Sequence, residues 1–205
     1  MPKSRPRLKI VRRFGVQLPG LTRKSAEKKP YPPGQHGQSK TGRRKTSEFR
    51  RLLEEKQKVR FNYGVSEGQL RRYLALARKM PGRTGENLLA VLERRLDNVV
   101  FRLGFAPTIP AARQLVSHGN ILVNGKKVDR PGYLAESGDE VSVKGKARER
   151  ADLMSNVERG PQLRLPSYIA LDPSSKFSGR VIGSPMKGDT PFPVNASALV
   201  EFYAR

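Results

Sequence analysis

Apolar residues between positions 47 and 119 recur at the spacing expected of amphipathic helices. The first such stretch starts near Ser47 and stops at Gly64, a residue type that commonly follows a helix. Its apolar face contains Phe49, Leu52, Leu53, Val59 and Tyr63. This pattern predicts a helix between Ser47 and Gly64.

A second and a third helix are predicted from their start and stop signals. Ser66 and Gln69 have the spacing of a capping box, and Pro-Gly at 81–82 ends the apolar pattern that follows. Thr84 is expected to cap a longer helix that closes at Gly104. The apolar stripe of that longer helix leaves a polar side with Glu93, Arg94, Arg95 and Asp97.

A short fourth helix is predicted over residues 107–119, and beyond it the apolar period changes from helical to alternating. Residues 121–123 lead into Asn124-Gly125, a strong hairpin signal, and residues 126–128 return. Proline breaks residues 144–195 into short pieces. In this last part of the chain we predict strands at 140–143, 168–171 and 180–182, and a short helix at 196–203.

The charge of the chain indicates a binding protein. Its 205 residues carry 41 Lys+Arg against 18 Asp+Glu, which gives a formal net charge of +23. Such a surplus repels itself unless a polyanion neutralises it, so the composition favours a nucleic-acid partner. A merely soluble basic protein is the alternative.

Composition also excludes several kinds of chemistry. The chain has no Cys, which rules out disulfides, thiolate catalysis and cysteine-based zinc sites. His36 and His118 are too few for a His-rich metal site or a conventional triad, so we expect each to contact RNA or to have a structural role. No apolar run approaches the roughly 18 residues of a membrane span, and residues 1–9 lack a signal-peptide pattern. We therefore expect a soluble intracellular protein.

Most of the excess positive charge lies at the start of the chain. Residues 1–47 contain fourteen Lys or Arg and one acidic residue, Glu27. They are rich in Pro and Gly and show no helical or alternating period, which is typical of an arm that orders only against a partner. A disordered tail is the alternative. Against it stand four apolar side chains that such a tail would usually lack, Phe14, Leu18, Leu21 and Tyr31.

Residues 94–143 combine a helix, a short basic helix and a tight hairpin. If their apolar stripes face one core, the module presents a rigid basic surface. The members of that surface are Arg95, Arg102, Arg113, His118, Lys126 and Lys127. Arginine forks bind phosphates, and RNA helices are read largely through shape, phosphates and 2′-hydroxyls, which suits such a surface. The alternative is an ordinary solvated face of a small α/β domain.

Several motifs resemble known sequences. Residues 94–129, RRLDNVVFRLGFAPTIPAARQLVSHGNILVNGKKVD, closely resemble the S4 RNA-binding module. Further segments, in family order, resemble the bacterial-type family of small-subunit ribosomal protein S-four, also called uS-four. These segments are RPRLKIVRRFG…LPGLTRK (5–24), YPPGQHGQ (31–38), EEKQKVRFNYGVSEGQLRRY (54–73), GRTGENLLAVLERRLDN (82–98) and ALVEFYAR (198–205).

The resemblance implies an α+β fold in three parts. Residues 1–46 would be an extended basic arm, and residues 47–93 a helical domain that residues from about 190 to 205 complete. Residues 94–189 would be the inserted S4 RNA-binding module, an α/β unit, with a short-stranded region after it. Many members of the family hold the arm with a four-Cys zinc site, whereas this chain without Cys would be a zinc-free variant with no metal and no cofactor.

The resemblance also implies a function. The chain would be a structural component of the small ribosomal subunit that binds 16S ribosomal RNA directly, nucleates assembly of the subunit body and contributes to translational accuracy, without enzyme activity. Its other expected partners are ribosomal protein S-five, further small-subunit proteins, and mRNA near the entry channel. We expect no membrane and no homo-oligomer. The expected location is the small subunit of ribosomes in the cytoplasm, with plastid ribosomes as the alternative.

Candidate rRNA-binding residues follow from the charge pattern and from positions that match the family. We expect no catalytic residue and no metal ligand among them. The candidates are Arg5, Arg7, Arg12, Arg13, Lys24, Tyr31, Gln35, His36, Arg43, Arg44, Lys56, Lys58, Arg71, Arg72, Arg95, Arg102, Arg113, Gln114, His118, Asn124, Lys126 and Lys127.

The main functional alternative is an RNA-modifying enzyme of the pseudouridine-synthase type that uses an S4 module for targeting. Arg95-Leu96-Asp97 resembles the tripeptide around the catalytic Asp of some of those enzymes. In this chain it falls inside the first helix of the module, so we expect Asp97 to pair with nearby arginines instead. A free RNA chaperone or heat-shock type S4 protein on stalled large subunits is a third alternative.

Overall fold

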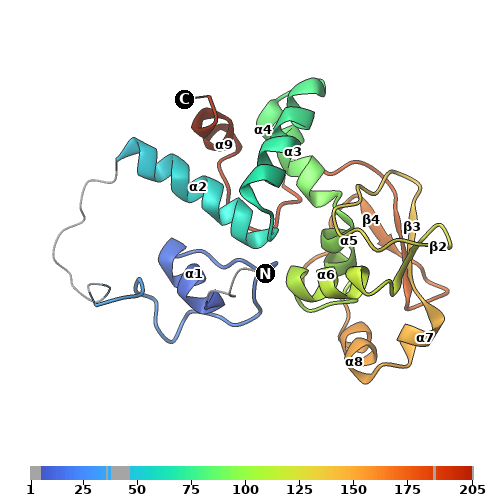
Figure 1. Ribbon diagram of the computed structural model, residues 1–205. Coiled ribbons are helices and arrows are strands. Elements are labelled where there is room, and N and C mark those ends of the chain that lie inside the picture. Colours follow the sequence, from blue (N-terminus) through green and yellow to red (C-terminus); the bar gives the residue numbers. More distant parts are fainter. Residues whose placement is uncertain (1–5, 36, 38–46, 187, 205) are drawn as a thin grey trace.

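The computed structural model describes residues 6–35, 37, 47–186 and 188–204. One end of the molecule is helical, and the other holds a five-stranded antiparallel sheet with further helices beside it (Figure 1). The fold class is therefore α+β, as the sequence predicts. The division into an arm, a helical domain and a module stays a prediction.

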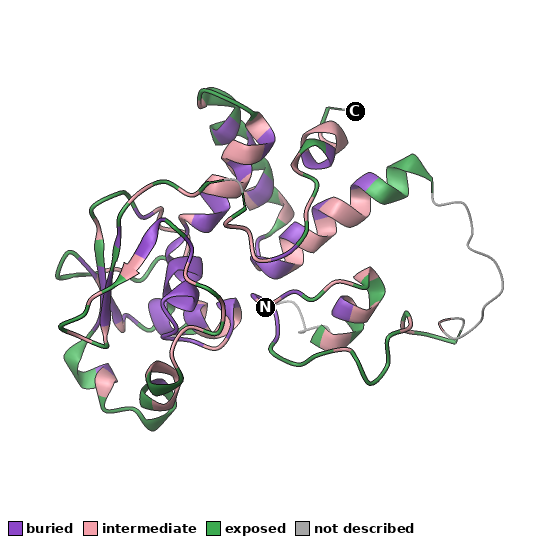
Figure 2. Ribbon diagram, turned by 180° about the vertical axis from the view of Figure 1, so that it is seen from behind, coloured by how far each residue is buried: buried purple, intermediate pink, exposed green. Residues whose placement is uncertain are grey.

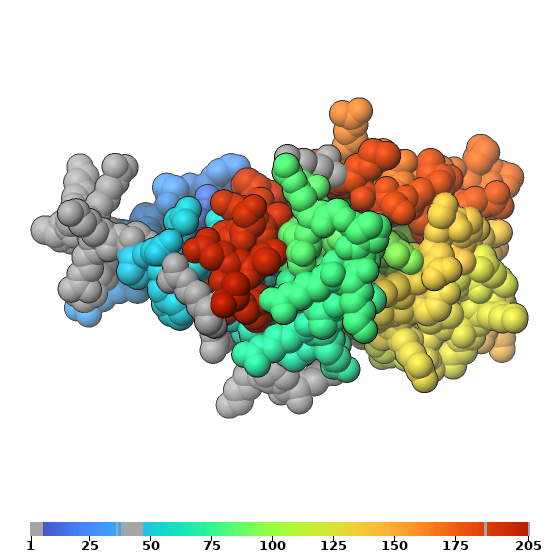
Figure 3. Space-filling view, turned by 90° about the horizontal axis from the view of Figure 1, so that it is seen from above, coloured from blue at the N-terminus to red at the C-terminus, as the bar shows by residue number. Residues whose placement is uncertain are grey.

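Four helices form the helical end, namely α2 (Glu48–Asn62), α3 (Glu67–Lys79), α4 (Thr84–Glu93) and α9 (Ala196–Phe202). α3 packs on α4, and the C-terminal α9 packs on both α2 and α4. Figure 3 shows the C-terminal residues in red, seated between α2 in cyan and the green helices. Gly85 permits this contact, because a Cβ at that position would lie 2.6 Å from the carbonyl oxygen of Ala196.

The predicted capping box at the start of α3 is confirmed. Ser66 Oγ accepts a hydrogen bond from the Gln69 amide at 3.2 Å, and Gln69 Oε1 accepts one from the Ser66 amide at 3.1 Å. Both bonds satisfy amides that have no partner within the first turn of a helix. This helix start is therefore specified by local sequence.

The long third helix predicted from the sequence is wrong, because it is two helices, α4 and α5 (Leu96–Arg102). Thr84 is the first residue of α4 rather than its cap. Between the two helices Arg95 is extended, and the amide of Leu96 donates to the carbonyl of Tyr133 at 2.8 Å. A segment distant in sequence thus satisfies an amide that a continuous helix would have bonded internally.

The sheet follows α6 (Ile109–Ser117), which packs against α5. Its strand order is β2-β1-β3-β5-β4, with all neighbours antiparallel. The predicted hairpin is confirmed, because Asn124 (φ 50°) and Gly125 (φ 74°) provide the pair of positive φ angles that a tight two-residue turn needs. Of the strands predicted after it, the one at 140–143 is confirmed with the same ends, and those at 168–171 and 180–182 are confirmed with shifted ends. The strands are β1 Ile121–Val123, β2 Lys126–Lys127, β3 Glu140–Val143, β4 Ile169–Leu171 and β5 Ser178–Val181.

Two helices that the sequence did not predict lie between β3 and β4. They are α7 (Gly145–Arg148) and α8 (Ala151–Arg159), and Figure 1 shows them at the bottom of the view, below the sheet and α6. Neither helix begins with a side-chain cap, so the usual start signal is missing from the sequence. Burial of Leu153 against the main core anchors α8.

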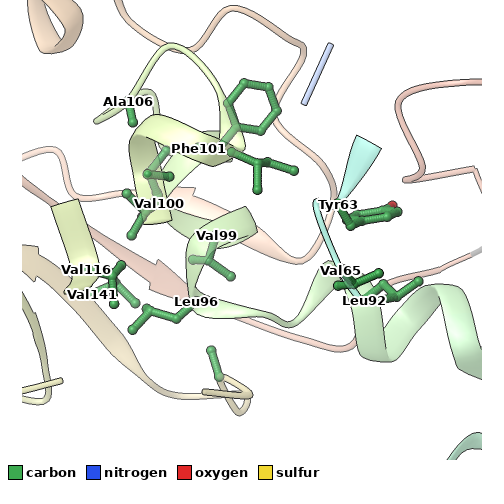
Figure 4. Packing of buried hydrophobic residues seen from close by; sticks show 14 of the residues in the cluster. Tyr63, Val65, Leu92, Leu96, Val99, Val100, Phe101, Ala106, Val116 and Val141 are labelled. Carbon is green, nitrogen blue, oxygen red and sulfur yellow. The ribbon is translucent and has the colours of Figure 1, made fainter. Parts of the chain in front are cut away.

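The core is centred on α5. All seven residues of α5 are buried, and Figure 2 shows this helix in purple. Leu96 and Val100 lie on the side of Val116 of α6 and Val141 of β3 (Figure 4), and Val99 is buried in the same cluster. Complete burial of such a side chain stabilises the fold by about 1.5–3 kcal/mol. The helix therefore joins α6 and the sheet into one unit.

The N-terminal segment contains a helix, α1 (Arg7–Phe14), so the expectation that this part has no helical structure is wrong. Leu18 and Leu21, two of the apolar residues that argued against a tail, are buried in the core. Between them the amide of Gly20 donates to Asn62 Oδ1 at 3.0 Å. This part of the segment is therefore ordered by contacts with the protein itself.

Candidate nucleic-acid interface

Four of the predicted contact residues lie together on α6 and the β1–β2 hairpin. Gln114, His118, Lys126 and Lys127 are all exposed. α6 directs the first two outward, because its opposite face is buried against α5. These four residues are called the module tip below.

The module tip is held together by a close contact across Gly119. The backbone of Gly119 has φ +69°, and a Cβ at that position would lie 2.1 Å from Lys127 Cε. The aliphatic stem of Lys127 therefore crosses the glycine directly after His118. This brings the ammonium group to the C-terminal end of α6, where the helix dipole favours a positive charge.

Asn124, a further candidate in the turn of the hairpin, is exposed but has internal partners. Its amide nitrogen donates to Asp139 Oδ1 at 2.8 Å, and its Oδ1 accepts from the backbone amide of Glu140 at 2.9 Å. The side chain thus fastens the hairpin to the start of β3. We assign it the role of orienting the tip lysines.

Arg95 was expected on the basic surface, and that expectation is wrong. Its side chain is 1% exposed and forms a bidentate pair with Asp97, with Nε–Oδ1 at 3.0 Å and Nη2–Oδ2 at 2.6 Å. The guanidinium also donates to the hydroxyl of Tyr73. Burial disfavours its charge, but Asp97 and Tyr73 outweigh burial and raise the pKa of Arg95. The Arg95 guanidinium is therefore part of the interior and not of the exposed basic surface.

Asp97 also forms an ion pair with a second arginine, as predicted from the sequence. Arg113 Nη2 lies 2.8 Å from Asp97 Oδ2, and Arg113 Nη1 donates to the carbonyl of Gly64 at 2.7 Å. The Arg113 side chain remains 33% exposed, so it connects α5, α6 and the loop after α2 while one side faces solvent. Both Asp97 oxygens therefore accept hydrogen bonds from arginines.

Arg102 was also expected on the surface and is instead buried, so that prediction is wrong. Its Nη2 lies 3.1 Å from Glu93 Oε2 and also donates to the carbonyl of Asp189. The hydroxyls of Tyr63 and Tyr168 donate to the same carboxylate. Burial first, and then the charge of Glu93, raise the pKa of both tyrosines well above its ordinary value. Glu93, predicted on a polar helix face, is thus an interior anchor.

Lys56 and Lys58 on α2 are directed toward acidic partners rather than toward open solvent. Lys56 is buried, with Nζ 3.1 Å from Glu67 Oε2 and 4.3 Å from the centre of the Phe202 ring. Lys58 is partly buried and pairs with Glu55. The charge of Lys56 is thus neutralised inside the helical end, and its role as an RNA contact stays a prediction.

The N-terminal candidates fall into three groups. Arg7, Arg13, Lys24 and Gln35 are exposed. Arg12 and Tyr31 are in contact. Arg12 Nε donates to the Tyr31 carbonyl at 3.0 Å, and the Arg12 guanidinium lies 4.7 Å from the centre of the Tyr31 ring. The remaining candidates Arg5, His36, Arg43 and Arg44 lie outside the described residues.

Further exposed cations lie on α3 and near the sheet. Two of them, Arg71 and Arg72 on α3, belong to the predicted candidates. Sequence reasoning did not single out Arg130, Lys144 and Lys146, which are exposed near the sheet. The signal for Lys144 was its place directly after the predicted strand 140–143, because pairing of β1 with β3 puts it next to Asn120.

Within the described ranges, no three His, Cys, Asp or Glu side chains are grouped so that they could hold a metal ion. In the same part of the chain, no helix has the length and apolar character needed to cross a membrane.

Two family models match the chain. Residues 3–93 match the ribosomal protein S4/S9 N-terminal domain, and residues 94–141 match the S4 domain. Curated relatives match over almost the whole length. The chain is 53% identical over 200 residues to the small ribosomal subunit protein uS4 of Thermosynechococcus vestitus, covering 98% of this chain and 96% of the relative. It is 50% identical over 199 residues to the protein of the same name from Methylobacillus flagellatus, covering 97% and 96%.

Proposed function

Because the chain belongs to the small ribosomal subunit protein uS4 family, we propose that it is a structural component of the small ribosomal subunit and binds 16S ribosomal RNA directly. The family resemblance drawn from the sequence motifs is thereby confirmed. In this role the chain nucleates assembly of the subunit body, contributes to translational accuracy and performs no chemical step.

The observation that carries the proposal is the separation of charges. The buried carboxylates Glu93 and Asp97 are neutralised by arginines inside the protein. Lys126 and Lys127 remain exposed on a short hairpin with a tight turn. A polyanion is therefore attracted to a surface of fixed shape, which suits RNA helices because they are recognised through shape and phosphates.

The mechanism is neutralisation of converging phosphates. Each phosphate contact releases condensed counterions, so affinity should fall with salt by a log–log slope of about 0.7 to 0.9 per contact. The module tip, the cations of α3 and those of the N-terminal segment face RNA in different places. A protein that contacts several RNA segments at once holds together strands whose phosphates repel each other.

We extend the proposal to partners and location. The chain resides in the small subunit, in cytoplasmic or plastid ribosomes, beside ribosomal protein S-five and other small-subunit proteins, and close to mRNA at the entry channel. The family membership supports this neighbourhood. Co-migration of the tagged chain with small subunits on a sucrose gradient tests it, and migration with large subunits instead would favour the chaperone alternative.

The direct test is charge reversal at the module tip. Lys126→Glu combined with Lys127→Glu should lower affinity for 16S rRNA by about 10- to 100-fold at 0.1 M salt and reduce the salt slope by about 1.5. A matched control, Arg164→Glu with Lys176→Glu, makes the same change of charge at exposed positions that are not part of the tip. Filter binding across a salt series measures both.

The proposal fails if the two double variants weaken binding equally, since total charge alone would then explain the affinity. Analysis of nucleosides after incubation of rRNA with the wild-type chain addresses the enzyme alternative. Stoichiometric binding without modified nucleosides is expected, and turnover would overturn the structural role.

A further inference from the structure

A pocket between α6 and α8 adjoins the module tip. Its volume is about 370 Å³, within the range of small-ligand sites. Gln114 and His118 line it from α6, and Asp152 and Asn156 line it from α8. The α8 side lies beyond residues 94–141, which match the S4 domain. This side of the pocket therefore lies outside the matched RNA-binding module.

The pocket has an apolar floor and a polar rim. Phe105, Leu115 and Leu153 form the floor and are buried in the main core. The rim carries side-chain amides from both helices, at Gln114 and Asn156. A nucleobase has the same division, with apolar faces and hydrogen-bonding edges, and single-stranded RNA is recognised through such splayed bases.

The charges of the rim suit a neutral base better than a phosphate. Arg150 and Asp152 form a bidentate pair, with Nη2–Oδ2 at 2.7 Å and Nε–Oδ1 at 3.1 Å. The arginine is thus neutralised, while the carboxylate can still accept a hydrogen bond from the exocyclic amine of a base. Free cationic charge lies instead on Lys127, whose stem crosses Gly119 directly after His118.

We propose that this pocket binds one unstacked nucleotide of the RNA, with its base between α6 and α8 and its phosphate at Lys127. The inference rests on the proposed function, because it names the element of the RNA that the module tip holds. It also gives α8 a role in recognition. Bases that carry an exocyclic amine, such as adenine, cytosine and guanine, fit the acceptor at Asp152.

The test blocks the pocket from α8. Asn156→Trp fills it, whereas Met154→Trp places the same side chain on the same helix at an exposed position that does not line the pocket. Each full-length variant is bound to 16S rRNA, and the bases are probed with dimethyl sulfate and kethoxal at nucleotide resolution. One base protected by the wild type and by Met154→Trp should become reactive with Asn156→Trp, and affinity should fall about tenfold.

Asn156→Leu provides a second variant in case the tryptophan disturbs folding, which circular dichroism reports. This variant retains the size of the side chain but removes the amide. Affinity for 16S rRNA should therefore fall about two- to threefold, which corresponds roughly to the loss of one hydrogen bond. Identical footprints and affinities for wild type, Asn156→Trp and Asn156→Leu would overturn the pocket while leaving the proposed function intact. Failure of the wild type to bind 16S rRNA would overturn both.

Discussion

Arg95 and Lys127 belong to the same module and have opposite environments. Arg95 is enclosed by Asp97 and Tyr73 at the start of α5, with 1% of its side chain exposed. Lys127 extends along Gly119 into solvent. Both are basic residues in a basic segment, so the sequence pattern does not separate them. The two residues differ because Arg95 has a carboxylate, Asp97, next to it in the folded protein.

This contrast shows that the module uses its arginines and its lysines differently. Arg95, Arg102 and Arg113 join α5 to surrounding elements through planar, multiple hydrogen bonds. The tip lysines carry a compact, hydrated charge at a turn. The carboxylate-paired arginines therefore fix the shape of the module, and exposed lysines supply its attraction for phosphates. Variants at the two kinds of site should separate stability from binding.

The largest effect is expected from Asp97→Ala. It leaves the buried guanidinium of Arg95 without its carboxylate, and removal of one partner from a buried pair costs about 3–5 kcal/mol. Urea unfolding followed by circular dichroism measures the loss in free energy of unfolding. Asp129→Ala, an exposed aspartate of the same module, is the control and should change stability by less than about 0.5 kcal/mol. Equal effects of both variants would mean that the buried pair does not stabilise the fold.

Arg113→Glu should have the next largest effect. The new carboxylate would face Asp97 and leave the Gly64 carbonyl without its donor, which we expect to cost about 2–3 kcal/mol. Because Arg113 is only partly exposed, affinity for RNA measured on the folded fraction should fall less than for the tip variants. A large loss of affinity with unchanged stability would instead place Arg113 among the direct RNA contacts.

The features predictable from the sequence are those encoded by adjacent residues. The Ser66–Gln69 capping box and the Asn124-Gly125 turn each need a few neighbouring side chains, and both are confirmed. Within the candidate site, the exposure of Lys126 and Lys127 follows from the same turn. Local geometry was sufficient for these elements.

The features that sequence reasoning missed depend on partners distant in the chain. Arg102 bonds the carbonyl of Asp189, and the helix break before α5 depends on the carbonyl of Tyr133. From the sequence alone, a basic residue on a helix is predicted to face solvent, because the buried carboxylate that pairs with it in the folded protein is not known. α8 was missed for a related reason. It begins without a side-chain cap, and the burial of Leu153 in the core anchors it.

The smallest expected effect on stability is at the ion pair of Lys56 with Glu67. This pair is intermediate between the buried arginine pairs and the exposed tip lysines, because Lys56 is buried and Glu67 is partly exposed. Burial raises the pKa of Glu67, but hydrogen bonds from Tyr203 and Lys56 outweigh it and lower that pKa below the ordinary value of 4.5. The charged form is thus favoured in the folded state. Its contribution is present above the unfolded pKa and is lost as the pH falls through the folded pKa.

Glu67→Gln should therefore be less stable than the wild type at pH 7, by under about 1 kcal/mol because solvent screens the pair. The difference should shrink as the pH falls below about 4.5 toward 3, since the wild-type carboxylate is then protonated as well. Urea unfolding of both chains at each pH measures it, and subtracting the two curves removes the other carboxylates. A difference that stays constant with pH would show that Glu67 holds the C-terminal helix by packing or neutral hydrogen bonds. Lys56 would then no longer belong with the charge-paired arginines of the interior.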